Sequence, residues 1–169
     1  VELYGKVKLN GKYKYDAKVG NVAVNSLVET DNLWLNQHNY VSAKAKLKYE
    51  LINKIQTLTI MNFPGMKSYN ISGKIKVNPT GKIDTIDFNY KDNKKTTVKI
   101  KGSLSTNDVN ISVEGTDFDA QLLTSLANLN IPLDGSTDFI LLMKGNPSNP
   151  YLTVTLNVES GEVFYVPFT

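Results

Sequence analysis

The stretch that decides the fold is Val41–Leu51, which reads VSAKAKLKYEL. Its odd positions hold Val, Ala, Ala, Leu, Tyr and Leu, whereas its even positions hold Ser, Lys, Lys, Lys and Glu. Successive side chains of a β-strand point to opposite faces, so this alternation separates apolar from polar side chains. A helix would scatter both sets around its circumference. We therefore expect a strand with one apolar face and one polar face.

The same two-residue period recurs along most of the chain. It predicts strands at Val1–Leu9 and Tyr13–Val19, joined by a hairpin turn at Asn10-Gly11. A slip of the apolar phase between Ile83 and Tyr90 indicates a bulge, and residues 32–36 fit either a short strand or a packed loop. Short polar turns separate the other expected strands, which are Tyr69–Val77, Ile83–Tyr90, Thr96–Leu104, Val109–Glu114, Phe139–Lys144 and Leu152–Glu159. This pattern is typical of an antiparallel meander.

One segment departs from the alternation. Its apolar residues recur at helical spacing, at Phe118, Leu122, Leu126 and Leu129. Thr116 or Asp117 can serve as the N-cap, and Pro132 lies just beyond the last of these residues. The sequence therefore predicts an all-β fold with one short helix at 117–129. We interpret residues 1–169 as a single domain that is a fragment of a longer protein.

The composition excludes several classes of function. The chain has 19 basic and 16 acidic residues, and the basic ones are lysines spread singly through the alternating segments. Nucleic-acid binding needs clustered basic charge with arginines, so we expect no nucleic-acid partner. The chain has no cysteine, which excludes disulfides and a thiol nucleophile. No apolar stretch reaches the roughly 18 residues that a membrane-spanning helix needs, so we expect anchors and targeting signals outside this fragment.

Candidate catalytic and metal-binding residues are few. His38 is the only histidine, and no catalytic motif surrounds it, so we interpret it as an exposed loop residue. The closest carboxylate pairs, Asp117/Asp119 and Asp84/Asp87, are explained by helix capping and solvation. No glycine-rich loop precedes a helix, as a phosphate site would require. We therefore expect no enzymatic activity, no metal and no cofactor, with a chance pairing of two carboxylates left open.

The polar face carries rows of lysines, such as Lys44, Lys46 and Lys48, or Lys99 and Lys101. A row of this kind could contact an anionic surface. It could equally be a solvated face that discourages edge-to-edge aggregation, and we favour this second interpretation.

The apolar face contains residues that are unusually small for a protein core. Gly5, Gly73 and Gly102 each lie between two aliphatic residues, in a motif that repeats along the chain. These glycines either mark bends and close packing, or leave room for an apolar ligand such as an acyl chain. Burial of about 0.8 kcal/mol per CH₂ would give one such chain on the order of 10 kcal/mol before the costs of association.

On the ligand interpretation, the apolar residues of the alternating segments line the groove. They are Leu3, Val7, Leu9, Tyr13, Tyr15, Val41, Ala43, Ala45, Leu47, Ile71, Ile75, Val98, Ile100, Val109, Ile111, Val113, Phe139, Leu141, Met143, Leu152, Val154, Leu156 and Val158.

Residues 116–168 carry a resemblance to a known family. After the expected helix come a Leu-x-Gly strand, a Gly-x-x-x-x-Pro turn and a following strand that ends near a glycine. This arrangement resembles the C-terminal region of the AsmA-like family, in particular the TamB translocation and assembly proteins of the bacterial envelope. The matching residues are Leu133, Gly135, Gly145, Pro150 and Gly161. Val154 departs from the pattern, because the family often repeats a glycine there.

The resemblance implies a β-sheet curved lengthwise into a U-shaped, taco-like groove with an apolar interior. It further implies a periplasmic location, with the parent protein anchored in the inner membrane. The function implied is the movement of phospholipid between the inner and outer membranes, or assistance in the assembly of outer-membrane proteins. The expected partners are a phospholipid or another acyl-chain ligand and an outer-membrane barrel protein.

A different class of function stays open from the residues alone. Many short alternating strands also fit a β-sandwich adhesin or a carbohydrate-binding module. In that case Trp34 and the tyrosines would form a sugar platform. Two closed sheets with Trp34 on a flat exterior would favour the sugar, whereas an apolar cleft along one sheet would favour the lipid.

Overall fold

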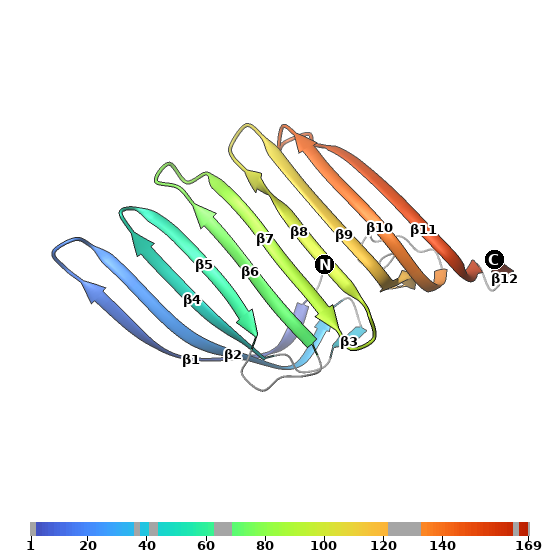
Figure 1. Ribbon diagram of the computed structural model, residues 1–169, viewed down its shortest axis with the longest axis horizontal. Helices are drawn as coiled ribbons and strands as arrows, with labels where there is room; N and C mark the ends of the chain where they lie inside the picture. Colours follow the sequence, from blue (N-terminus) through green and yellow to red (C-terminus); the bar gives the residue numbers. More distant parts are fainter. Residues whose placement is uncertain are drawn as a thin grey trace.

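A computed structural model describes residues 3–35, 38–40, 44–62, 69–121, 133–163 and 166–168. These residues form one sheet of twelve strands, and every neighbouring pair is antiparallel (Figure 1). The strands are β1 Leu3–Asp16, β2 Asn21–Leu35, β3 His38–Tyr40, β4 Lys44–Ile52, β5 Ile55–Asn62, β6 Tyr69–Val77, β7 Ile83–Asp92, β8 Thr97–Leu104, β9 Val109–Asp119, β10 Leu133–Gly145, β11 Tyr151–Val163 and β12 Val166–Phe168.

The sheet is an open meander. Its order is β1-β2-β4-β5-β6-β7-β8-β9-β10-β11-β12, with β3 beside β2, and the two ends of this order do not pair. The prediction of an all-β antiparallel meander is therefore confirmed. In the described part of the chain there is a single sheet, so these residues do not form the two packed sheets of a sandwich.

The predicted turn at Asn10-Gly11 is wrong. Both residues lie inside β1, which stays paired with β2 from Lys6 to Asp16. The alternation continues unbroken through Gly11, and this glycine admits the neighbouring strand, because a Cβ atom there would lie 2.7 Å from the Cβ of Ser26. The chain instead reverses at 17–20, where Gly20 has a φ of 67°, a conformation that favours glycine.

The sequence did not predict the full extent of β2 or the presence of β5. Residues 32–35 belong to β2, which settles the choice between strand and loop in favour of the strand. Strand β5 follows β4 through a tight turn at Asn53 and Lys54. Both turn residues have positive φ, of 52° and 65°, as in the two-residue hairpins whose twist suits paired strands.

The predicted bulge within Ile83–Tyr90 is confirmed. The register of β7 with β8 shifts between Ile83 and Ile86, and that of β6 with β7 shifts between Lys76 and Val77. These shifts return the apolar residues on either side of the slip to the same face of the sheet.

The predicted start of the helix at 117 is wrong, because β9 continues to Asp119. A bulge opposite Asp138 carries the strand past Asp117, whose φ is 52°. The Asp117 amide donates to Asp138 Oδ1 at 2.9 Å, and Ser136 Oγ donates to Asp117 Oδ1 at 2.6 Å. Asp117 thus supports a bulge and does not cap a helix. Residues 122–129 of the predicted helix lie outside the described residues.

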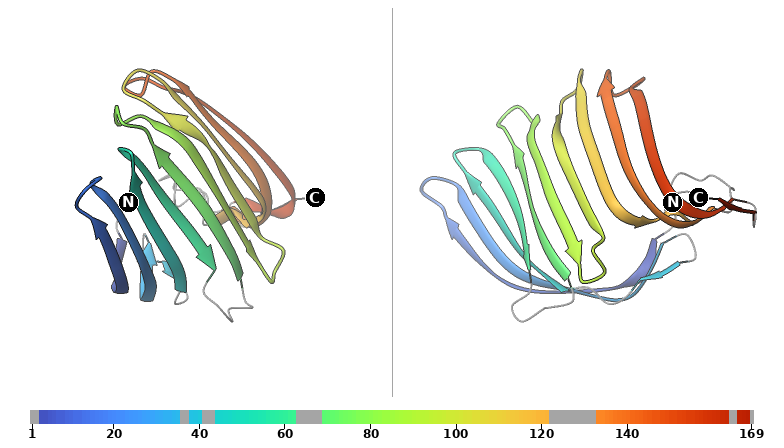
Figure 2. Two further views of the ribbon diagram at one scale, coloured as in Figure 1. Left: turned by 60° about the vertical axis from the view of Figure 1, so that its left-hand side comes forward. Right: turned by 45° about the vertical axis from the view of Figure 1, so that its right-hand side comes forward.

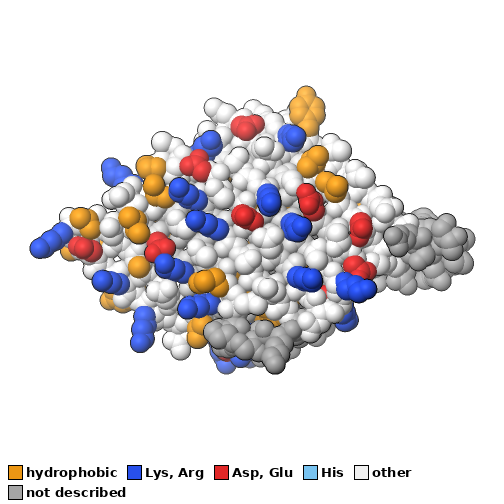
Figure 3. Space-filling view, in the orientation of Figure 1, with side chains coloured by type: hydrophobic (Ala, Val, Ile, Leu, Met, Phe, Trp, Pro, Cys, Tyr) orange, Lys and Arg blue, Asp and Glu red, His pale blue; other side chains and the backbone are white. Residues whose placement is uncertain are grey.

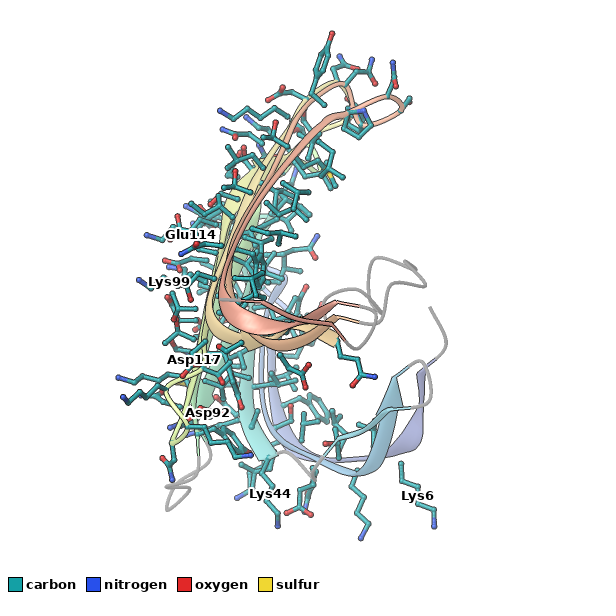
Figure 4. The ribbon with its side chains drawn as sticks, turned by 90° about the vertical axis from the view of Figure 1, so that its right-hand side faces the viewer. Lys6, Lys44, Asp92, Lys99, Glu114 and Asp117 are labelled. Carbon is teal, nitrogen blue, oxygen red and sulfur yellow. The ribbon has the colours of Figure 1, made fainter. Side chains whose placement is uncertain are left out.

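The sheet twists, and its long strands bend along their length (Figure 2). Seen along the sheet in Figure 4, Lys99 and Glu114 point away from the side toward which the long strands bend. A groove with an apolar interior on that side stays a prediction.

Candidate functional site: one apolar face of a single sheet

The strand register gathers apolar side chains on one face of the sheet. Residues that pair across antiparallel strands point to the same side, so each row of partners can be followed from strand to strand. We use the term apolar face for the side that carries the row Ser26, Leu47, Ile60, Gly73, Phe88, Ile100, Val113, Leu141 and Val154. Two further rows run beside it, through Leu58, Ile75 and Ile86, and through Ile71, Tyr90 and Val98.

Most of the predicted lining residues share this face. The register places twenty of them there, namely Val7, Leu9, Tyr13, Tyr15, Ala45, Leu47, Ile71, Ile75, Val98, Ile100, Val109, Ile111, Val113, Phe139, Leu141, Met143, Leu152, Val154, Leu156 and Val158. Val41 and Ala43 lie outside the described residues, and Leu3 is described only as a backbone partner of Leu35. That these residues line a lipid groove stays a prediction.

Sequence reasoning missed the contributions of β2 and β5 to the face. Val22, Val24 and Val28 of β2 pair with apolar-face residues of β1 and β4. Leu58 and Ile60 of β5 pair with Tyr49 and Leu47. Part of the signal was present, because Val22 and Val24 of β2 and Leu58 and Ile60 of β5 follow the two-residue period. The period is obscured by Ser26 and Asn62 on the apolar face and by Leu27 and Met61 on the polar face.

Burial on this face is uneven. Val109 and Phe139 are only 2% and 6% exposed, and with Ala120 they are the buried apolar residues of the described part. Toward the edges the exposure rises to 67% for Leu9 and 57% for Leu152. Between these extremes most residues of the face are half-buried. Within the described residues, the face is therefore packed mainly against itself and keeps much of its apolar surface accessible.

Neighbouring rings fill the space beside two glycines of the face. A Cβ atom on Gly73 would lie 2.9 Å from Phe88 Cδ2, and one on Gly115 would overlap the ring of Phe139. Phe139 also contacts Phe118 edge-to-face, with ring centroids 5.4 Å apart. At Gly102 an added Cβ would meet the backbone of Asn110 and Ile111. Close packing is therefore the correct interpretation of Gly73 and Gly102. At Gly73 and Gly115, any room for a ligand must lie above the neighbouring ring.

The opposite, polar face mixes both signs of charge (Figure 3). Lys44 pairs with Glu29 at 3.0 Å between neighbouring strands, and Lys48 pairs with Glu50 at 2.8 Å along one strand. The register also sets Lys99 opposite Glu114. Partly exposed pairs of this kind contribute little to stability, about 0–1 kcal/mol each. The mixture fits the interpretation of the lysine rows as a solvated face.

The carboxylates considered earlier have structural partners. Asp84 accepts a hydrogen bond from Asn78 Nδ2 at 3.2 Å and lies 3.8 Å from Lys82 Nζ. Asp87 accepts from Asn89 Nδ2 at 3.1 Å. The described residues contain no group of three metal-ligating side chains. The side chain of His38 is outside the described part.

Tyr90 is the one described residue with a clearly perturbed pKa. Burial within the apolar face raises the pKa of its phenol, and the nearby Asp92 and Tyr69 raise it further. The Tyr69 ring stacks on that of Tyr90 with centroids 6.3 Å apart. The strand partners of Tyr90 are Ile71 and Val98, so its surroundings offer little solvation to the ionised phenolate.

No helix among the described residues combines the length and the apolar character needed to cross a membrane. Comparisons with protein-family models, with curated proteins and with solved structures find no match to this chain.

Proposed function

We propose that the chain is a non-enzymatic, lipid-binding segment of a bacterial envelope protein of the AsmA-like, TamB-like kind. In this proposal the apolar face holds the acyl chains of phospholipid that moves between the inner and outer membranes. The same segment can assist the assembly of outer-membrane proteins. The parent protein is placed in the periplasm with an anchor in the inner membrane.

The observation that carries the proposal is the half-buried apolar face of a single-layer sheet. Soluble monomeric proteins rarely leave more than a few hundred Å² of contiguous apolar surface in water. Here the face crosses the ten strands on the path from β1 to β11, and the described residues place no second sheet over it. An acyl chain laid along this face would remove apolar surface from water without requiring any specific polar contact.

Two further features support a lipid as the ligand. The rows that cross the middle of the face are mainly aliphatic and aromatic, which suits hydrocarbon, and its hydrogen-bonding groups include tyrosine hydroxyls and the side chains of Gln56 and Asn62. The long strands bend away from the side on which Lys99 and Glu114 lie (Figure 4). An acyl chain on the apolar face would therefore be partly surrounded by the bent strands.

The strand–turn–strand unit behind the resemblance is present where the sequence predicts it. Gly145 ends β10 with a φ of 97°, and Pro150 directly precedes β11. Gly135 and Gly161 are partners across the same pair of strands. The hairpin is compatible with the family resemblance, which stays a hypothesis about the parent protein.

Photo-crosslinking from adjacent residues tests the proposal. Ala45 and Lys46 are both half-buried in β4, but Ala45 pairs with Val28 on the apolar face and Lys46 with Leu27 on the polar face. A photoreactive amino acid at 45 should capture phospholipid in cells of a Gram-negative bacterium, whereas one at 46 should not. Mass spectrometry of the adducts, and of an organic extract of gently purified protein, would identify the lipid. Equal capture at both positions, or none at either, would reject lipid binding by this face.

A further inference from the structure

We propose that two β-bulges, one on each side of β10, bend the ends of β9, β10 and β11 toward the apolar face, so that these ends form a wall beside it. The bend is a property of the backbone and can be measured on the protein without lipid. That the wall contacts an acyl chain rests on the proposed function and is tested separately.

The two bulges lie at the same level of the sheet. Between Phe139 and Thr137, β10 advances by two residues, whereas its partner β9 advances by three, over residues 115–118. Between Thr137 and Ser136, β10 advances by one residue, whereas its partner β11 advances by two, over residues 158–160. The extra residues are Asp117 in β9 and Glu159 in β11. Both neighbours of β10 are therefore longer than β10 by one residue at this level.

The extra residue of β9 is held by specific hydrogen bonds. The amide of Asp117 donates to Asp138 Oδ1 at 2.9 Å, and its carbonyl accepts from Thr96 Oγ1 at 3.0 Å. Its carboxylate accepts from Ser136 Oγ at 2.6 Å. A bulge takes its extra residue out of the backbone ladder, and an unpaired backbone group is costly once it is removed from water. Here side chains replace both missing backbone partners, so this bulge is a stable part of the fold.

The bulge of β11 is also fixed to its neighbour. Thr137 of β10 lies between the two bulges and is only 1% exposed. Its Oγ1 donates to Asn157 O of β11 at 3.1 Å. A buried side chain thus binds the backbone of the bulged strand directly beside the extra residue, which fixes the position of this bulge.

The bend of the strands coincides with the bulges. In Figure 4 the ends of β10 and β11 turn away from the side on which Lys99 and Glu114 lie, and Asp117 lies beside this turn. A bulged strand bends because it must place more backbone than its partner over the same length of ladder. An extra residue on both sides of β10 therefore accounts for a bend that all three strands share.

The opposite flank of the sheet shows the same combination. From Lys6 to Tyr4, β1 advances by two residues, whereas β2 advances by three, from Asp31 to Trp34. The ends of β1 and β2 also turn to the side away from Lys99 and Glu114 (Figure 4). On both flanks the long strands therefore bend where one strand carries an extra residue.

Deleting the extra residues tests whether they cause the bend. Without Asp117 and Glu159, the residue pairs on either side of each bulge can join into unbroken ladders in the same register. The double deletion should therefore straighten the three strands. Asp117→Gly is the matched control, because it removes the side chain but keeps the extra residue, and glycine readily adopts the φ of 52° found there. This variant should keep the bend.

A pair of spin labels measures the bend. The chain has no cysteine, so Leu133→Cys and Leu152→Cys create two unique labelling sites toward opposite ends of the β10–β11 pair. Leu152 lies opposite Met143, which is ten residues from Leu133 along β10, and a straight strand of that length spans about 33 Å. Neither deletion changes the length of β10. Electron–electron double resonance without lipid should give a shorter distance in the undeleted protein and in Asp117→Gly, and the distance of a straight strand in the double deletion.

Equal label distances in the double deletion and in Asp117→Gly would overturn the proposal, with circular dichroism showing that both proteins keep their strands. If the double deletion does not fold, either single deletion gives the same test on one side of β10, and an unchanged distance in both would overturn the proposal equally.

Phospholipid that co-purifies with the protein tests the wall. The straightened protein should retain clearly less phospholipid than Asp117→Gly. If both retain the same amount, these strand ends form no wall for the acyl chain, whereas lipid binding by the apolar face still stands. If the undeleted protein itself retains no phospholipid, the proposed function fails and the wall has no ligand, whereas the label distances still decide whether the bulges cause the bend.

Discussion

The ring of Phe88 lies beside Gly73 on the neighbouring strand, with Phe88 Cδ2 only 2.9 Å from the position of a Cβ atom on that glycine. The two residues are direct partners in the register of β6 with β7. The same relationship recurs between Gly115 and Phe139 of β9 and β10. In both cases an aromatic ring covers backbone that the glycine leaves bare. A single-layer sheet thus gains packing within its own face, where other proteins would use a second layer.

Gly73→Val should therefore destabilise the fold. The added side chain collides with Phe88, and overpacking of this kind costs about 1–3 kcal/mol in the free energy of unfolding. Removing the ring should relieve the collision, so Gly73→Val should cost less in a Phe88→Ala background. Urea denaturation of the four variants in this cycle measures the coupling. Ser72→Val, at an exposed neighbouring position on the polar face, is the control and should change stability by less than about 0.5 kcal/mol.

Phe139→Ala should be among the most destabilising changes in the described part. Phe139 is 6% exposed and contacts both Gly115 and Phe118. Truncating a buried phenylalanine costs about 3–5 kcal/mol. Leu152→Ala, on the same face but 57% exposed at the sheet edge, should cost clearly less. Denaturant midpoints would show the difference, and equal losses would contradict a core centred on Phe139.

The alternation of residues was sufficient to predict the fold class and most of the apolar face. It predicts a face wherever the period is unbroken, and the register then joins these faces across the sheet. It failed where local signals conflicted with long-range pairing. Asn10-Gly11 has the composition of a hairpin turn, but pairing along the whole of β2 keeps β1 extended through it. The helical spacing after Phe118 is real in the sequence, yet the pairing of Phe118 with Thr137 extends β9 to Asp119.

The packing of the glycines could not be predicted from the sequence. Gly73 and Gly102 have the same local pattern, with an aliphatic residue two positions away on each side. Their partners differ, because Gly73 faces a phenylalanine of β7, whereas Gly102 approaches the backbone of β9. Only the register identifies which residue lies opposite. For the same reason, the composition of the face could not distinguish a filled glycine position from an open one.

Stability should fall at alkaline pH as the Tyr90 phenol ionises. Its pKa in the folded state is raised by burial, with Asp92 and Tyr69 adding to the rise. The folded state therefore holds this proton more tightly than the unfolded state does. The resulting stabilisation is complete below the ordinary tyrosine pKa of about 10 and is lost as the pH rises through the higher, folded value. Tyr90→Phe should make the decline above pH 10 less steep. Urea denaturation at a series of pH values measures it, and parallel curves for the two proteins would contradict the assignment.

Ala45→Asp should empty the apolar face of lipid, whereas Lys46→Asp should not. Ala45 pairs with Val28 and Asn62 on the apolar face, and Lys46 pairs with Leu27 and Met61 on the polar face. An unpaired carboxylate among acyl chains costs several kcal/mol, which is comparable to the net binding energy of one chain after association costs. The change at Lys46 alters net charge even more, since it replaces a cation by an anion, so charge alone cannot explain a loss at 45. Circular dichroism would confirm that both variants keep their strands, and mass spectrometry of the co-purified lipid would measure the retention. If the folded Ala45→Asp protein retained as much phospholipid as the Lys46→Asp protein, the lipid would have to bind somewhere other than the apolar face.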